Sequence, residues 1–62
     1  MEVETNLLNR RVVIYKKDGY VKAGFLKSIF DKFVLLRYDS GREEIISTDS
    51  IISIKLAREE RI

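Results

Sequence analysis

The sequence contains no cysteine, histidine, tryptophan or proline. Without cysteine, no disulfide bond can stabilise the fold, and without cysteine or histidine the chain lacks the usual zinc ligands. The same absences remove the thiol nucleophile and the imidazole acid–base group that many enzymes use. We therefore expect a protein that is not an enzyme and that needs no metal or cofactor.

Long apolar runs and a secretory start are also missing. No apolar stretch approaches the roughly 18 residues that a membrane-spanning helix requires. Met1 is followed by Glu2 and Glu4, whereas a secretory signal begins with basic residues. We expect a cytoplasmic protein that does not contact a membrane.

The small size of the chain predicts one domain that associates with itself. A chain of about 60 residues buries only about 60% of its unfolded surface, so its stability alone is marginal. The sequence has 62 residues, of which 45% are hydrophobic and 35% charged, which is typical of a globular domain and not of a disordered chain. Because disulfides and metal ligands are absent, oligomerisation is the remaining common means of stabilising such a domain.

Strand-forming residues dominate the middle of the chain. Runs rich in β-branched and aromatic residues lie at 12–15, 33–36, 45–46 and 51–54. Residues that favour tight turns separate them, at Asp18-Gly19, Asp31-Lys32, 38–42 and 48–50. This punctuation predicts five strands, at residues 11–17, 20–30, 32–38, 42–47 and 51–56.

The second of these strands does not alternate cleanly between apolar and polar residues. Val21, Ala23 and Phe25 share one parity, and the apolar residues that follow take the other. A bulge or a sharp bend near Gly24 would switch the parity and let one long strand serve two sides of a barrel. We therefore predict a mainly β fold, a small and strongly bent five-stranded antiparallel barrel.

The two ends of the chain differ in character from this block. Residues 1–9 form a leader in which 2–9 are predicted to make a short helix that packs Leu7 and Leu8 on the barrel. Residues 10–56 form the barrel, and 57–62 form a charged tail. The whole of 1–62 is expected to be a single domain.

Several segments resemble the Sm/Lsm superfamily, including its bacterial Hfq branch, over nearly the whole chain. They are Val12–Gly19 as the first strand and turn, the spacing of Gly19 and Gly24, Ile29–Leu36 beside the Hfq-type Ser-Phe-Asp-Gln-Phe-Val segment, and Ile46–Ile54 as the end of the second Sm motif. Three features depart from the family pattern. One extra residue separates Gly24 from Asp31, Leu35 stands at the usual base-reading Asn, and Ser47-Thr48-Asp49 replaces the Hfq-type Tyr-Lys-His.

The resemblance implies an Sm-like barrel whose fourth strand pairs with the fifth strand of the next subunit, giving a homo-oligomeric ring, a hexamer or a heptamer. It also implies that the ring binds single-stranded RNA that is U-rich or A/U-rich. By this resemblance Phe33 stacks on a base and the turn at 47–49 lines the rim. Lys32 stands where Hfq-type proteins carry a Gln, and as a lysine beside the turn it is expected to contact a phosphate. The implied RNA-binding residues are Asp31, Lys32, Phe33, Ser47, Thr48 and Asp49.

Each of these residues also has a purely structural interpretation. Phe33 can pack at a subunit contact, Asp31 can cap its own turn, and Lys32 can simply be solvated. Asp49 either places a carboxylate at the rim, where it repels phosphate, or caps the turn beside a basic neighbour. The corresponding alternative function is an Sm-like barrel that acts as a protein-interaction or scaffold module without appreciable RNA binding.

Positive charge is concentrated in one part of the chain. The net charge is only +2, but residues 10–32 contain seven basic and two acidic side chains. A basic stripe with Tyr15, Tyr20 and Phe33 nearby is typical of a surface that binds single-stranded nucleic acid. The alternative is that these lysines and arginines keep the strands soluble and protect their edges.

Overall fold

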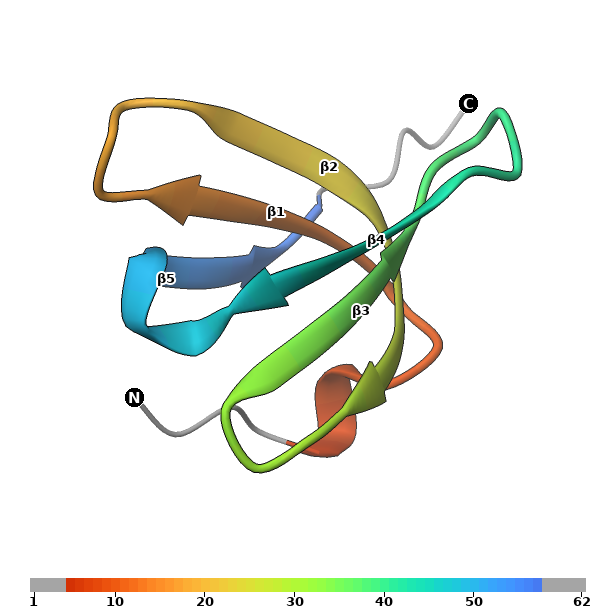
Figure 1. Cartoon of the computed structure of the whole chain (residues 1–62). Helices are drawn as coiled ribbons and strands as arrows, with labels where there is room; N and C mark the ends of the chain where they lie inside the picture. The colour runs from red at the N-terminus through yellow and green to blue at the C-terminus, as the bar shows by residue number, and fades with distance from the viewer. Residues whose placement is uncertain (1–4, 58–62) are drawn as a thin grey trace.

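The structure is a computed structural model that describes residues 5–57, and it contains one five-stranded antiparallel sheet (Figure 1). The strands are β1 (Arg11–Lys16), β2 (Val21–Ile29), β3 (Phe33–Arg37), β4 (Glu43–Ser47) and β5 (Ile51–Leu56). Their order across the sheet is β4-β3-β2-β1-β5. The predicted mainly β, five-stranded antiparallel class is confirmed, and every predicted strand boundary lies within one residue of the observed one.

The prediction of a closed barrel is wrong, because the sheet is open. β4 and β5 are the two outer strands of the sheet, and no ladder joins them. They are consecutive in sequence and are linked only by the 3-10 turn η2 (Thr48–Ser50), which forces the sheet to curl until its two edges meet at that corner. From there β5 runs along β1, and the Lys17 N–H bonds to the Ser50 carbonyl at 2.8 Å. The strands therefore diverge from the corner instead of pairing.

The predicted N-terminal helix is not seen. Of its residues 2–9, the first three lie outside the described residues, and the described part contains only the 3-10 turn η1 (Thr5–Leu7). The Arg10 N–H bonds to the Leu7 carbonyl at 3.1 Å, and Asn9 has a positive φ of 63° that ends the turn. Leu7 and Leu8 still pack against the core. The packing was therefore predicted correctly, and the helix was not.

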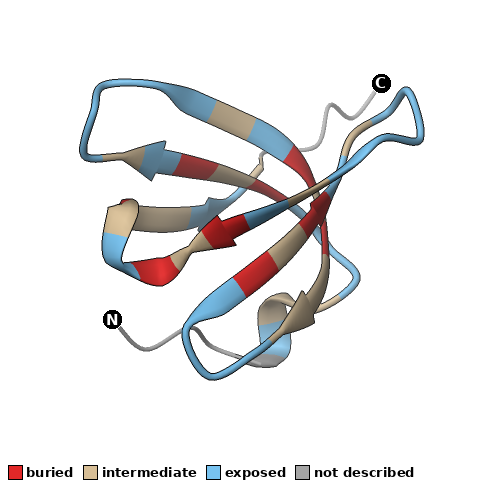
Figure 2. Ribbon diagram, in the orientation of Figure 1, coloured by how far each residue is buried: buried red, intermediate tan, exposed pale blue. Residues whose placement is uncertain are grey.

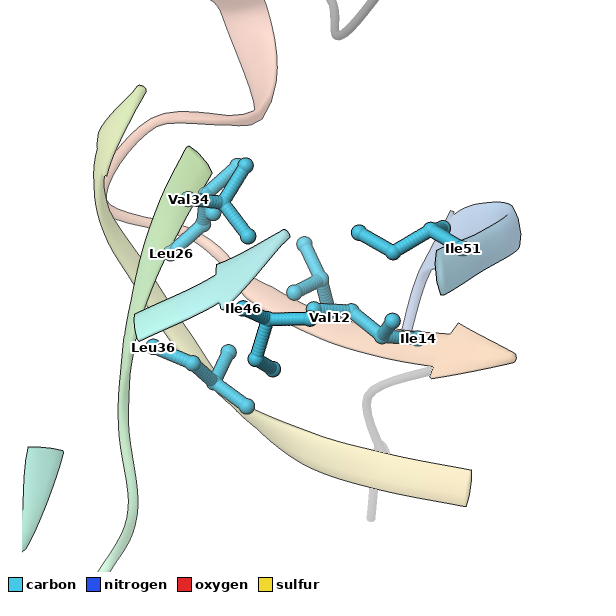
Figure 3. Close-up of a cluster of buried hydrophobic side chains, with 7 residues drawn as sticks. All are labelled: Val12, Ile14, Leu26, Val34, Leu36, Ile46 and Ile51. Carbon is cyan, nitrogen blue, oxygen red and sulfur yellow. The ribbon is translucent and has the colours of Figure 1, made fainter. Parts of the chain in front are cut away.

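All five strands contribute to the core, which lies on the inner face of the curled sheet (Figures 2 and 3). Its buried side chains are Val12, Ile14, Leu26, Val34, Leu36, Ile46 and Ile51. Each of these is at most 3% exposed. In the strands β1, β3 and β4 these residues alternate with outward-facing ones, as the period of two requires.

The bulge in β2 is not at Gly24 but three residues later. Leu26 pairs with Leu36 and Ser28 pairs with Leu35, so Lys27 is the extra residue. Gly24 shares the inner face with Leu26 and is needed for another reason: a Cβ atom there would lie 2.5 Å from the Arg37 carbonyl oxygen. A tight approach of β2 to β3 therefore explains this glycine.

A second irregularity occurs where β5 pairs with β1. Tyr15 pairs with Ser53 and Lys16 with Ile51, which leaves Ile52 as the extra residue. Ile51 is buried, whereas the side chain of Ile52 is 63% exposed. The bulge switches the parity of β5, so that both Ile51 and Ile54 contact the core.

Two further expectations concern the chain as a whole. The charged tail at 57–62 lies outside the described residues except for Ala57. In the portion from 5 to 57, no helix is long and apolar enough to cross a membrane.

Candidate nucleic-acid interface

The short turn between β2 and β3 presents an aromatic side chain to solvent. The Phe30 N–H bonds to the Phe33 carbonyl at 2.7 Å, which closes a tight turn with Asp31 and Lys32 at its tip. Val34 is the next residue and points into the core, so Phe33 points outward. Its side chain is 45% exposed, which leaves ring surface available for a ligand.

A second segment, distant in sequence, is held against this turn. Phe33 pairs with Ser47 across the β3–β4 ladder. The backbone N–H of Thr48 donates to the Lys32 carbonyl at 2.9 Å, and the Thr48 hydroxyl donates to the same oxygen at 3.2 Å. The structure therefore brings together all six residues that the sequence analysis grouped, at the corner where β4 meets η2.

These six residues do not all face solvent. Asp31, Lys32, Phe33 and Asp49 are exposed, and Ser47 is half-buried. Thr48 is only 6% exposed, and its hydroxyl is used by the Lys32 carbonyl. Thr48 therefore braces the two turns against each other, and it is not positioned to contact a ligand.

The turn at η2 is capped by Ser47 and not by Asp49. The Ser47 hydroxyl oxygen accepts from the Asp49 N–H at 3.3 Å, and the Ser50 hydroxyl donates to the Ser47 carbonyl at 2.7 Å. The Asp49 carboxylate makes no ion pair with any basic residue between 5 and 57. The alternative in which Asp49 is a neutralised cap is therefore wrong for the described residues.

Asp31 likewise does not cap its turn. Among residues 5–57, no backbone N–H donates to its carboxylate, although the carboxylates of Asp18 and Asp39 do accept hydrogen bonds. Asp31 and Asp49 place two exposed carboxylates at this corner, where the exposed cations are Lys32, in the same turn as Asp31, and Lys17, whose N–H bonds to the Ser50 carbonyl at 2.8 Å. The carboxylates offset these cations, so aromatic stacking is the contact that the corner offers best.

The sequence analysis missed a second aromatic residue at this turn. Phe30 is 46% exposed and stands directly opposite Phe33, on the other side of Asp31 and Lys32. Residues that flank a two-residue turn project from the same face of the hairpin. Since Ile29 and Val34 are the next pair and face the core, Phe30 and Phe33 share the outer face. The signal was the spacing Phe-Asp-Lys-Phe, with one aromatic residue on each side of a turn.

Three of the seven basic residues at 10–32 are engaged in ion pairs elsewhere on the sheet. Lys16 lies 3.7 Å from Asp18, Lys22 lies 3.6 Å from Glu44, and Arg11 lies 3.0 Å from Asp39. The Lys55 ammonium group lies 5.7 Å from the ring centroid of Tyr15. Positive charge is therefore spread over several strands and is not focused on the Phe30–Phe33 turn.

Comparisons with known proteins add no relative to this description. No protein-family model matches the sequence, and neither the curated proteins nor the solved structures give a match. Within the described part of the chain, no group of three or more acidic side chains is placed to hold a metal ion.

Proposed function

We propose that the chain is a cytoplasmic Sm-like protein that forms a homo-oligomeric ring and binds single-stranded, U-rich or A/U-rich RNA. The observation that carries this proposal is the Phe30–Phe33 turn. Two half-exposed rings share one face of a hairpin whose position is fixed by hydrogen bonds from Thr48. Each base that stacks on such a ring contributes about 1–3 kcal/mol without any reading of sequence.

The ring part of the proposal rests on the two open edges of the sheet. Within residues 5–57, β4 and β5 each lack a partner on one side, and each carries an isoleucine, Ile45 or Ile52, that is more than 60% exposed. Unpaired apolar edges promote aggregation, and closed cyclic pairing removes them. Pairing of β4 in one copy with β5 in the next would complete every ladder, in a hexamer or a heptamer.

Assembly would also overcome the weak electrostatics of the corner. Asp31 and Asp49 disfavour phosphate near a single Phe30–Phe33 turn, so one copy would bind RNA weakly. Several copies in one ring raise the effective concentration of the second and later turns for the same strand. Affinity in this proposal therefore depends on the assembly as well as on the rings.

Fluorescence anisotropy with a labelled oligo-U, at low and at high salt, tests RNA binding. Phe33→Ala should weaken binding by about 1–3 kcal/mol, because it removes one stacking surface. Tyr20→Ala is the comparison variant, since Tyr20 is 67% exposed on the β1–β2 hairpin and not at the corner. If Tyr20→Ala weakens binding and Phe33→Ala does not, RNA binds elsewhere and the assignment is wrong.

Light scattering on the same samples tests the ring. The wild type and Phe33→Ala should share one mass, six or seven times that of the chain. The variant Ile52→Lys should lower that mass, since it places a charge on the open edge of β5. A wild-type mass equal to one chain would contradict the ring. An intact ring with no oligo-U binding at low salt would favour the scaffold function instead.

A further inference from the structure

A pocket of about 520 Å³ lies where β1 begins and β5 ends, and it shares no residue with the Phe30–Phe33 turn. It is lined by Asn9, Arg10, Arg11, Phe25, Leu56 and Ala57. Its volume is in the range of small-molecule sites, roughly 300–1,000 Å³. Its lining combines two guanidinium groups with the apolar side chains of Phe25 and Leu56, so it suits a ligand that has both an anionic and a flat apolar part.

The guanidinium group of Arg11 is held in a fixed plane. It lies 4.7 Å from the ring centroid of Phe25, its partner across the β1–β2 ladder. Two of its nitrogens donate to the Asp39 carboxylate, at 3.0 Å and 3.4 Å. Phe25 supports the plane on one side and Asp39 fixes its edge, while the side chain remains 41% exposed. A guanidinium plane held in this way is a stacking surface for a planar base.

Charge in the pocket comes from a different residue. Asp39 balances the charge of Arg11, so that Arg11 acts mainly through its shape. The neighbouring Arg10 is exposed and makes no ion pair with an acidic residue between 5 and 57. The backbone around it is well fixed, because the Asn9 N–H donates to the Leu26 carbonyl at 2.6 Å and the Leu26 N–H donates to the Arg10 carbonyl at 3.1 Å.

We propose that this pocket binds one nucleotide, with the base stacked on the Arg11 guanidinium plane and the phosphate at Arg10. Leu56, which is 46% exposed, covers the apolar edge of the base. The ligand is either a free mononucleotide or one unit of an RNA strand, since both present a base and a phosphate. The inference does not require RNA binding at the Phe30–Phe33 turn, because the two surfaces have no residue in common.

The full chain is titrated with AMP, UMP, inorganic phosphate and oligo-U. The changes in its backbone amide NMR shifts show where each ligand binds. The expected result is that AMP and UMP shift the amides of the pocket residues, and that phosphate alone does so more weakly. Arg11→Lys keeps the charge but removes the plane, so it should weaken mononucleotide binding roughly tenfold. Arg10→Lys should bind like the wild type, whereas Arg10→Gln should bind more weakly.

Two controls separate this site from other effects. Arg42→Gln removes the same kind of charge from the exposed β3–β4 hairpin and should leave mononucleotide binding unchanged. The titration is repeated with Phe33→Ala: pocket shifts that persist there show that the pocket acts independently of the proposed RNA site. If only oligo-U shifts the pocket amides, the nucleotide is part of a strand.

Two results would overturn the inference. One is the absence of any pocket shift with mononucleotides and with oligo-U. The other is equal mononucleotide binding by Arg11→Lys and the wild type, since a general attraction of cations for phosphate would then explain everything. The amide spectrum of each variant shows directly whether it is folded, so a loss of binding through unfolding is recognised.

Discussion

The hydroxyl group of Tyr38 donates a hydrogen bond to the carboxylate of Glu44, and the Lys22 ammonium group lies 3.6 Å from the same carboxylate oxygen. Tyr38 continues the inner face of β3 beyond Leu36, and Glu44 continues that of β4 beyond Ile46. This network therefore closes one end of the apolar core with polar groups that satisfy one another. The shared hydrogen bond raises the pKa of Tyr38 and lowers the pKa of Glu44.

The loss of folding stability at alkaline pH should depend on Tyr38. Burial, and then the hydrogen bond to Glu44, raise the pKa of Tyr38 from 10.0 to about 12. The stabilisation from this shift is fully present below the pKa that Tyr38 has in the unfolded state. It is lost as the pH rises through the pKa of Tyr38 in the folded state. Urea unfolding of the wild type should therefore show a decline between pH 10 and about 12 that is smaller in Tyr38→Phe. Parallel declines in both proteins would show that the hydroxyl is not responsible.

The loss of folding stability at acid pH should depend on Glu44. The hydrogen bond from Tyr38, supported by Lys22 and Lys16, lowers the pKa of Glu44 below 4.5 despite its partial desolvation. The stabilisation from this shift is present above the pKa that Glu44 has in the unfolded state. It disappears as the pH falls through the pKa of Glu44 in the folded state. Glu44→Gln should therefore lose less stability than the wild type when the pH is lowered through this range. The neighbour Glu43 pairs with Arg37 at the exposed surface, so Glu43→Gln is a control for the removal of a carboxylate from the same strand.

Local sequence signals predicted the strands well because the strands are built from local rules. β-branched runs and turn residues such as Asp18-Gly19 act over a few positions, and they placed all five strands to within one residue. Closure of the sheet is different, since it depends on whether β4 and β5 meet across the fold. Periodicity within either strand carries no information on that contact.

Bulges and the site show the same division. The parity switch in β2 was visible in the sequence. The bulge was predicted near Gly24, because glycine favours such irregularities, but the extra residue is Lys27. Gly24 is required by a contact with Arg37, which is distant in sequence. Likewise, the sequence grouped Thr48 with the RNA-binding residues, yet its burial and its hydrogen bond to Lys32 make it a brace. Only tertiary contacts distinguish these roles.

Gly24→Ala should destabilise the fold by sterics. An added Cβ would lie 2.5 Å from the Arg37 carbonyl oxygen, and this backbone atom cannot move without disturbing the β2–β3 ladder. Overpacking of this kind costs about 1–3 kcal/mol of unfolding free energy. Gly41→Ala is the control, since nothing lies within 4 Å of its added Cβ and only its φ of 92° opposes the change. A larger loss at Gly41, measured by urea unfolding, would argue against the steric explanation.

The brace between the two turns of the proposed RNA site rests on a single hydroxyl group and one backbone N–H. Thr48→Val removes the hydroxyl that donates to the Lys32 carbonyl but keeps the shape and the N–H bond. We expect a loss of about 1 kcal/mol in unfolding free energy. We also expect weaker oligo-U binding, because the Phe30–Phe33 turn loses part of its support.

Thr48→Ser is the matched control for this prediction. It keeps the hydroxyl and removes only a methyl group, so it should retain more oligo-U affinity than Thr48→Val. Anisotropy titrations of both variants, at a urea-free condition where each is folded, provide the comparison. Full affinity in Thr48→Val would mean that the backbone bond alone positions the turn. Equal losses in the two variants would assign the effect to packing in the buried corner rather than to the hydrogen bond.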